Sequence, residues 1–144
     1  MKVYLDNCCF NRPFDDQSQI RIQLEAHAKL YVQDQIKKGK IELVWSYILD
    51  YENSFNLFEE RKNLIQKWEI EAKQYIVENA QILEIANNLS NIGLKSKDAL
   101  HVACAVESNC DYSLTTDDKI LKKLLNYSKI KVVNPLTFIA NLND

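Results

Sequence analysis

The chain has 144 residues, of which 47% are hydrophobic and 26% are charged, and its formal net charge is −2. This length fits one domain with its own core, and the composition excludes a disordered chain. The slightly negative charge argues against the broad basic surface of a protein that coats nucleic acid non-specifically. A polyanion would have to bind at a local patch or through metal cations. We therefore expect a single domain over residues 1–144.

The longest apolar runs cover only a few residues, for example 3–5 and 43–45. Such runs are too short for a transmembrane helix or a signal peptide, so we expect a cytoplasmic protein with no membrane association. In that compartment the four cysteines would be reduced thiols. They form no C-x-x-C pair, which argues against a zinc site.

The first third of the chain predicts a strand, a loop and a long helix. Residues 2–5 are β-prone and stop at Asp6, and a loop is expected through residues 11–13. A helix should then begin at Asp15 or Asp16 and end at Gly39. The side chains expected on its buried face, by helical spacing, are Ile20, Leu24, His27 or Ala28, Tyr31 or Val32, and Ile36.

The middle of the chain predicts a second strand at residues 41–45, followed by a helix that Ser46 caps. Apolar residues continue at helical spacing as far as Ile76, through a polar stretch at residues 59–63. This pattern leaves open two helices or one bent helix.

The last third alternates helices with strands. Helices are expected over residues 82–89, from Ser96 to about Asn109, over 119–125 and over 136–142; strands are expected over 112–114 and 131–133. Alternating strands and helices predict an α/β fold with a parallel sheet that is covered on both faces.

Four acidic residues are expected near the carboxyl ends of the strands, where ligands bind in open parallel sheets. Asp6 and Asp117 directly follow strands, Asp98 lies in the first turn of a helix, and Glu52 lies two turns into the helix after the second strand. Each has an alternative structural role as a turn former, a helix cap or a solvated side chain. Together, clustered carboxylates repel one another and need a compensating cation, and hard oxygen ligands suit Mg²⁺ or Mn²⁺.

Five segments in this order resemble the signature of PIN domains: residues 3–6 (VYLD), 46–52 (SYILDYE), 97–105 (KDALHVACA), 114–117 (LTTD) and 133–135 (VNP). The most specific are the Asp-Ala-Leu-His helix and the Thr-x-Asp turn. The resemblance covers nearly the whole chain. It implies a three-layer α/β/α sandwich with a central, mainly parallel sheet.

The resemblance also implies a function, endonucleolytic cleavage of RNA by a water activated by Mg²⁺ or Mn²⁺. Asp6 and Asp98 would be the central metal ligands, with Glu52 and Asp117 completing the shell directly or through water. Asp50 competes with Glu52, and we prefer Glu52 for its distance from Ser46.

Several neighbours of the acids are candidate substrate-binding residues. Thr115 and Thr116 would orient ligands or bind a phosphate, and Asn7 would supply the polar group that many relatives carry where this chain has Cys8. Arg12 is the fourth candidate, because it flanks the site in sequence. The candidates that would hold the RNA backbone are Arg12, Lys95, Lys97 and Lys119.

Two further side chains receive structural interpretations. His101 lies one helical turn after Asp98, and we expect a packing or hydrogen-bonding role rather than contact with substrate. Asp118 is expected at the surface, paired with Lys122.

Three alternatives remain open. A phosphatase or receiver domain with a nucleophilic aspartate is disfavoured because Asp6-Asn7-Cys8 lacks the second acid of an Asp-x-Asp motif. A catalytically inactive PIN-like module that binds RNA or protein would require the four acids to serve no reaction. The resemblance often extends to VapC-type toxins, which form homodimers and are neutralised by a small antitoxin, and it leaves open whether this chain is one.

Overall fold

Five parallel strands form the centre of the structure, a computed structural model that describes residues 1–142. The strands are β1 (Lys2–Leu5), β2 (Glu42–Ser46), β3 (Gln74–Ile76), β4 (Tyr112–Leu114) and β5 (Lys131–Val133). They lie in the order β3-β2-β1-β4-β5, and every neighbouring pair is parallel. The central strand is therefore β1, whose carboxyl end has a neighbouring strand on each side.

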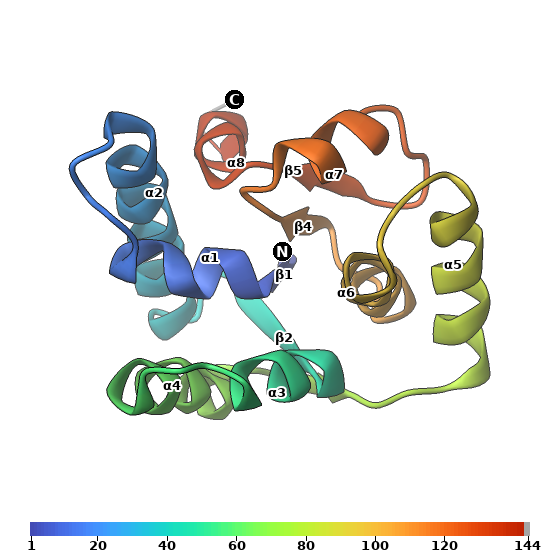
Figure 1. Cartoon of the computed structure of the whole chain (residues 1–144), viewed down its shortest axis with the longest axis horizontal. Helices are drawn as coiled ribbons and strands as arrows, with labels where there is room; N and C mark the ends of the chain where they lie inside the picture. Colours follow the sequence, from blue (N-terminus) through green and yellow to red (C-terminus); the bar gives the residue numbers. More distant parts are fainter. Residues whose placement is uncertain (143–144) are drawn as a thin grey trace.

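Helices cover both faces of this sheet. They are α1 (Asn7–Asn11), α2 (Ile20–Lys37), α3 (Tyr47–Ser54), α4 (Glu59–Gln66), α5 (Ala80–Asn91), α6 (Ser96–Glu107), α7 (Asp118–Lys123) and α8 (Pro135–Leu142), with 3₁₀ turns η1 (Arg12–Phe14) and η2 (Lys67–Glu71). Figure 1 shows α2 and α8 on one side of the sheet and α5 and α6 on the other, and within each pair the helices contact one another. The predicted α/β/α arrangement is confirmed.

The inner strands are apolar because both of their faces are covered. Val3, Tyr4 and Leu5 of β1 have no exposed surface, and the same is true of Leu43, Val44 and Trp45 of β2. None of the helices described over residues 1–142 has the length and apolar character needed to cross a membrane.

The helical pattern predicted as far as Ile76 is wrong at its end. The chain leaves α4 at Gln66, passes through η2, and forms the edge strand β3, which pairs with β2. Tyr75 is exposed and Ile76 is buried, as the alternating faces of a strand require. In the sequence, three residues are too few to distinguish this alternation from helical spacing. The interruption between the two helices lies at residues 55–58, ahead of the predicted polar stretch.

The segment after β1 also differs from the prediction. Asp6 caps a short helix, α1, where a loop was expected, and α2 begins at Ile20 rather than at Asp15 or Asp16. Gly39 follows the end of α2 with a φ of +74°, which suits the predicted stop.

The buried face of α2 is partly polar, and this corrects the predicted core. Ile20 is 73% exposed, and Leu24 and Tyr31 are also exposed, whereas Ala28, Val32 and Ile36 are buried as expected. The other side chains buried on this helix are Glu25, Ala26, Lys29 and Gln33. Hydrophobic spacing missed this face because the partners that make a buried Glu25 tolerable lie elsewhere in the chain.

The remaining helices and strands agree with the predictions to within a few residues at their ends. Ser96, however, is the first residue of α6 rather than its cap, which is Lys95. The expected pair of Asp118 with Lys122 is also replaced, because Asp118 accepts two hydrogen bonds from Arg21 of α2, at 2.6 and 2.7 Å.

Candidate active site

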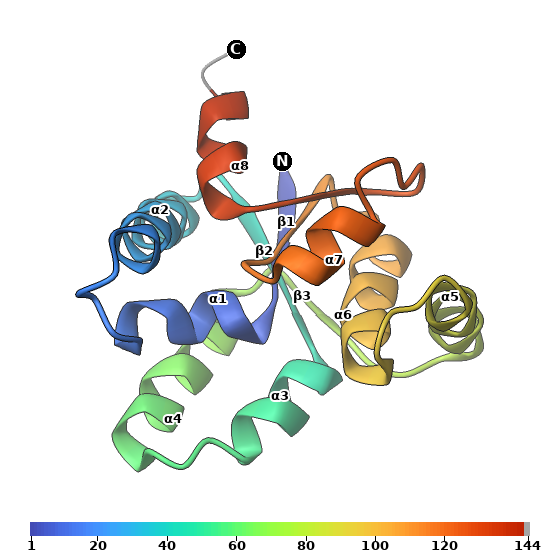
Figure 2. The ribbon, with the colours of Figure 1, turned by 45° about the horizontal axis from the view of Figure 1, so that its top comes forward.

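The four predicted acids lie on the elements that surround the carboxyl end of β1. Asp6 follows β1 directly and caps α1, and Asp117 follows β4 and caps α7. Asp98 lies in the first turn of α6, and Glu52 lies in α3, which begins where β2 ends. Figure 2 shows α1, α3, α6 and α7 grouped around this end of β1. Segments far apart in the sequence thus contribute carboxylates to one region.

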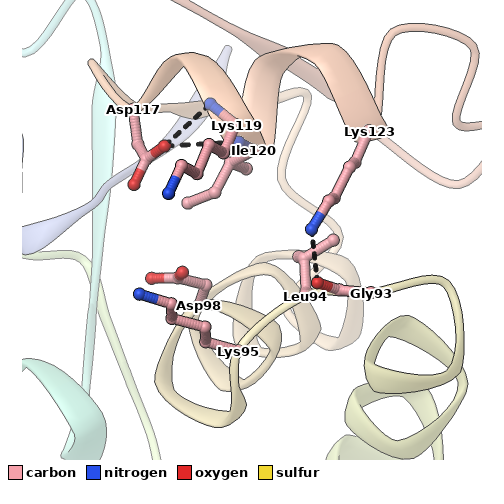
Figure 3. A pocket seen from close by; sticks show the side chains of 8 residues that line it. All are labelled: Gly93, Leu94, Lys95, Asp98, Asp117, Lys119, Ile120 and Lys123. Atoms are coloured by element: carbon pink, nitrogen blue, oxygen red, sulfur yellow. Dashed lines mark hydrogen bonds between the residues drawn. The ribbon is translucent and has the colours of Figure 1, made fainter.

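Asp98 and Asp117 share a pocket of about 150 Å³. Figure 3 shows the two carboxylates pointing toward each other across it, from α6 and from the turn before α7. The other residues that line this pocket are Gly93, Leu94, Lys95, Lys119, Ile120 and Lys123. Lys95 and Lys119, which the sequence placed beside the acids, thus line the pocket, and so does Lys123, which it did not.

Asp98 is half-buried, and no donor among residues 1–142 gives its carboxylate a hydrogen bond. Burial and the negative charges of Asp6 and Asp117 raise its pKa above the ordinary value. Glu52 adds to this rise and His101 opposes it. Asp6, Asp117 and Glu52 are thus all close enough to repel Asp98, and within residues 1–142 no lysine or arginine forms a salt bridge with any of the four acids.

Asp6 and Asp117 also act as helix caps. Asp6 Oδ1 accepts a hydrogen bond from the Cys8 amide at 3.2 Å, and Asp117 Oδ1 accepts from the amides of Lys119 at 2.8 Å and Ile120 at 3.4 Å. These contacts use only Oδ1, and no hydrogen bond within the described part of the chain uses Oδ2 of either residue. The structural role and a role as metal ligand are therefore compatible.

Within residues 1–142, no group of three or more Asp, Glu, His and Cys side chains is arranged as a ready-made metal site. The carboxylates of Asp6, Asp117 and Glu52 are each held instead by a hydrogen bond from the chain itself. The chemistry of the cluster nevertheless fits a hard divalent ion, because the atoms that it offers are carboxylate oxygens.

Glu52 is held by two side chains. Its Oε2 accepts a hydrogen bond from Asn7 Nδ2 at 3.4 Å, and its Oε1 is bonded to His101 Nε2. Burial raises the pKa of Glu52, but the bond to His101, the charges of His101 and Lys97 and the bond from Asn7 together outweigh that effect and lower the pKa overall. Glu52 is therefore kept as a carboxylate.

His101 links Glu52 to the interior of the sheet. Its Nδ1 lies 2.5 Å from the Tyr4 hydroxyl, which lies 2.7 Å from Ser46 Oγ. A carboxylate can only accept, so Nε2 carries the hydrogen and Nδ1 of the neutral ring accepts from Tyr4. Burial lowers the pKa of His101, whereas Asp6 and Glu52 raise it by more. The predicted hydrogen-bonding role of His101 is confirmed.

Asp50 has a different environment from Glu52. Its Oδ1 accepts from Trp45 Nε1 at 2.8 Å and from Gln66 Nε2 at 2.7 Å, and Oδ2 accepts from the Tyr75 hydroxyl. These bonds tie β2, β3 and α4 together. Asp50 therefore has structural partners, and Glu52 is the acid of α3 that faces the cluster.

Two of the predicted substrate-binding residues support the turn after β4. Thr115 Oγ1 accepts from the Asp117 amide at 3.2 Å and lies 3.4 Å from Cys8 Sγ. The Thr116 amide donates to the same sulfur at 3.4 Å. Cys8 therefore connects α1 to the Asp117 turn.

The other two lie in different surroundings. Asn7 contacts Glu52, and its Oδ1 is buried without a partner among the described residues. Arg12 is paired with Glu25 at 2.8 Å and with Asp15 at 3.1 Å, so its charge is already compensated within the chain. A role for Arg12 in binding RNA would require it to leave these partners.

The residues that sequence reasoning missed are Tyr4 and Ser46. A tyrosine in an otherwise aliphatic buried strand was the available signal, because a buried hydroxyl needs a partner. Ser46 was predicted only as a helix cap, and its Oγ does accept a hydrogen bond from the Leu49 amide at 3.2 Å. Its Oγ also bonds to the Tyr4 hydroxyl and so extends the series of hydrogen bonds that ends at Glu52.

Comparison with known proteins gives structural matches only. No protein-family model and no curated sequence matches the chain. A chain of VapBC2 from Rickettsia felis, solved with a DNA fragment from the VapBC2 promoter, matches with a TM-score of 0.58 and 14% identity, over 93% of this chain and 98% of that one. A chain of VapBC-1 from nontypeable Haemophilus influenzae matches with a TM-score of 0.60 and 15% identity, over 94% and 99%. The chain therefore has a PIN-like α/β fold, as the resemblance implied.

Proposed function

We propose that this protein is an endoribonuclease that depends on Mg²⁺ or Mn²⁺ held by Asp6, Glu52, Asp98 and Asp117. The observation that carries the proposal is the environment of Asp98. This carboxylate is half-buried without a donor among residues 1–142, and burial and the neighbouring acids raise its pKa. A group so placed is unfavourable in a structural role, whereas it is suited to a site where a cation binds.

The oxygens available to an ion are those that the chain does not use. Within residues 1–142 they are Oδ2 of Asp6, Oδ2 of Asp117 and both carboxylate oxygens of Asp98. Glu52, whose two oxygens bond to Asn7 and His101, would complete the shell through water. When bound, a divalent ion supplies a hydroxide-like water near neutral pH and stabilises negative charge on the phosphate.

The surrounding side chains would hold the acids in place. His101 and Asn7 fix the carboxylate of Glu52 from two directions, and Thr115 fixes the turn that carries Asp117. Lys95 and Lys119 line the pocket between Asp98 and Asp117, where their charges would attract the RNA backbone.

The test is cleavage of end-labelled RNA by the purified protein, with single-stranded DNA of the same sequence alongside. We expect cleavage with Mg²⁺ or Mn²⁺ and none in excess chelator. Asp98→Asn should raise the activation barrier by about 4 kcal/mol, which slows cleavage about 1000-fold. The matched control is Asp34→Asn, which removes an exposed carboxylate that pairs with Lys38 and accepts a hydrogen bond from Gln35. Cleavage that persists in chelator would refute the metal dependence, and its absence under all conditions would favour an inactive PIN-like binding module.

The matched structures are of VapBC proteins, and from this we propose that the chain is a toxin with an antitoxin partner. Co-expression with the product of the neighbouring gene would test this. A small protein that co-purifies with the chain and stops RNA cleavage is the expected result. We also propose that the chain forms a homodimer, and size-exclusion chromatography of the chain alone would test this.

A further inference from the structure

Three exposed aromatic rings lie beside Glu52, at the end of α3 and in the segment that follows. Tyr51 is 51% exposed, Phe55 62% and Phe58 58%. Tyr51 and Phe55 contact edge to face, with ring centroids 5.0 Å apart. Large apolar rings left in water are unfavourable for the folded chain alone, and a group of them commonly marks a binding surface.

This aromatic surface borders a hollow of about 280 Å³ that reaches the acid cluster. The residues that line the hollow are Asn7, Asn11, Glu52, Phe55, Asn56, Leu57, Phe58 and Arg61. Asn7 and Glu52 also hydrogen-bond to each other within the candidate active site. A ligand in the hollow would therefore continue directly into that site.

Two cations accompany the rings. Lys97 Nζ lies 5.6 Å from the centroid of Tyr51 and 6.0 Å from that of Phe55. The Arg61 guanidinium lies 4.5 Å from the centroid of Phe58. Lys97 directly precedes Asp98, so positive charge lies both at the far side of the hollow and next to the acids. Aromatic rings combined with cations are the usual means of binding single-stranded nucleic acid.

We propose that Phe55 stacks on an unpaired nucleobase next to the cleaved bond, while Arg61 and Lys97 contact the flanking phosphates. The inference rests on the proposed function and adds a subsite of this chain, the side chains that hold the RNA beside the cleaved bond. Bases inside a duplex are already stacked on each other, so a protein ring can reach only unpaired bases. The cations and the continuity with the acids favour RNA over an apolar segment of a partner protein.

The test measures binding without cleavage, using RNA that carries 2-aminopurine, whose fluorescence is quenched by stacking. Chelator is present throughout, and Asp98→Asn serves as a second, non-cleaving background. Wild-type protein should quench single-stranded RNA and leave the duplex unchanged. Phe55→Leu, which keeps an apolar side chain but removes the ring, should abolish the quenching and weaken binding about 10-fold. Tyr31→Leu, at an exposed tyrosine of α2, is the matched control and should change binding less than about 2-fold.

Arg61→Gln gives an independent readout. It should keep the quenching but reduce by about one unit the slope of log affinity against log salt. Equal binding of single strand and duplex, or unchanged quenching in Phe55→Leu, would overturn the inference. So would a Phe55→Leu protein that binds RNA normally and fails only to bind the neighbouring-gene product. Loss of quenching in Phe55→Leu with no cleavage by wild type would instead refute the nuclease and leave the base-binding site standing.

Discussion

Glu25 and Asp98 represent two ways of placing an acid away from water. Glu25 is fully buried in α2, but Arg12, Arg21 and the Asn134 amide all bond to its carboxylate. Asp98 is only half-buried, yet it accepts no hydrogen bond from the described part of the chain, and burial and the neighbouring acids raise its pKa. Among the described residues Glu25 forms ion pairs with two arginines, whereas Asp98 forms none, although lysines line its pocket. The difference supports the proposal that Asp98 binds a cation, while Glu25 stabilises the fold.

The largest effect should appear at the acids of α3, in cleavage rather than in stability. Glu52→Gln removes a charge from the proposed metal site and should slow cleavage by about 1000-fold. Asp50→Asn disturbs its bonds to Trp45, Gln66 and Tyr75 and should cost about 1–3 kcal/mol of stability while most cleavage remains. Cleavage rates and urea unfolding of both variants check this. The reverse result would place the site on the other side of α3.

The next effect separates the compensated acid from the uncompensated one. Glu25→Gln leaves the half-buried Arg12 with only Asp15 as an acidic partner among the described residues and should lower the free energy of unfolding by about 1–3 kcal/mol. Asp98→Asn removes repulsion and should leave the stability of the metal-free protein unchanged or raised. Chemical denaturation in chelator measures both. If Asp98→Asn is instead the more damaging change, Asp98 is a structural residue of the first turn of α6.

The smallest effect concerns Lys29, a buried basic residue that, unlike Glu25, has no ion pair among the described residues. Burial lowers its pKa to about 7, below the value near 10.4 of an unfolded lysine, and no acid within residues 1–142 forms a salt bridge with it. Between these values the unfolded chain binds a proton that the folded chain does not, so stability rises with pH. Lys29→Met should be the more stable protein at pH 7, and its advantage should shrink by about 1 kcal/mol by pH 8. A constant difference would show that Lys29 keeps its proton when folded.

How far the sequence predicted the molecule depended on how local each signal was. The strand before Asp6 and the helix that carries Asp98 and His101 were predictable, because apolar runs and helical spacing lie within the segments themselves. The edge strand β3 was missed because its three residues fit a helix equally well, and their pairing with β2 is not local.

The same reason explains the errors around the site. The prediction for α2 was wrong at Ile20, which is exposed, and missed the buried Glu25, because Arg12 and Asn134 come from other parts of the chain. The four acids were found through their positions at strand ends and through family resemblance. The contacts of His101 with Tyr4 and Glu52 could not be read from spacing, since the three lie on separate elements.

Thermal unfolding of wild type and Asp98→Asn, each in chelator and in Mn²⁺, tests the central claim most directly. If the acid cluster binds the ion only in the folded state, Mn²⁺ should stabilise wild type by about 2.7 kcal/mol at a hundred times its Kd. Asp98→Asn should gain much less from Mn²⁺ and should be at least as stable as wild type in chelator. A wild-type protein whose Tm does not respond to Mn²⁺, together with an Asp98→Asn variant that is less stable in chelator, would contradict the account.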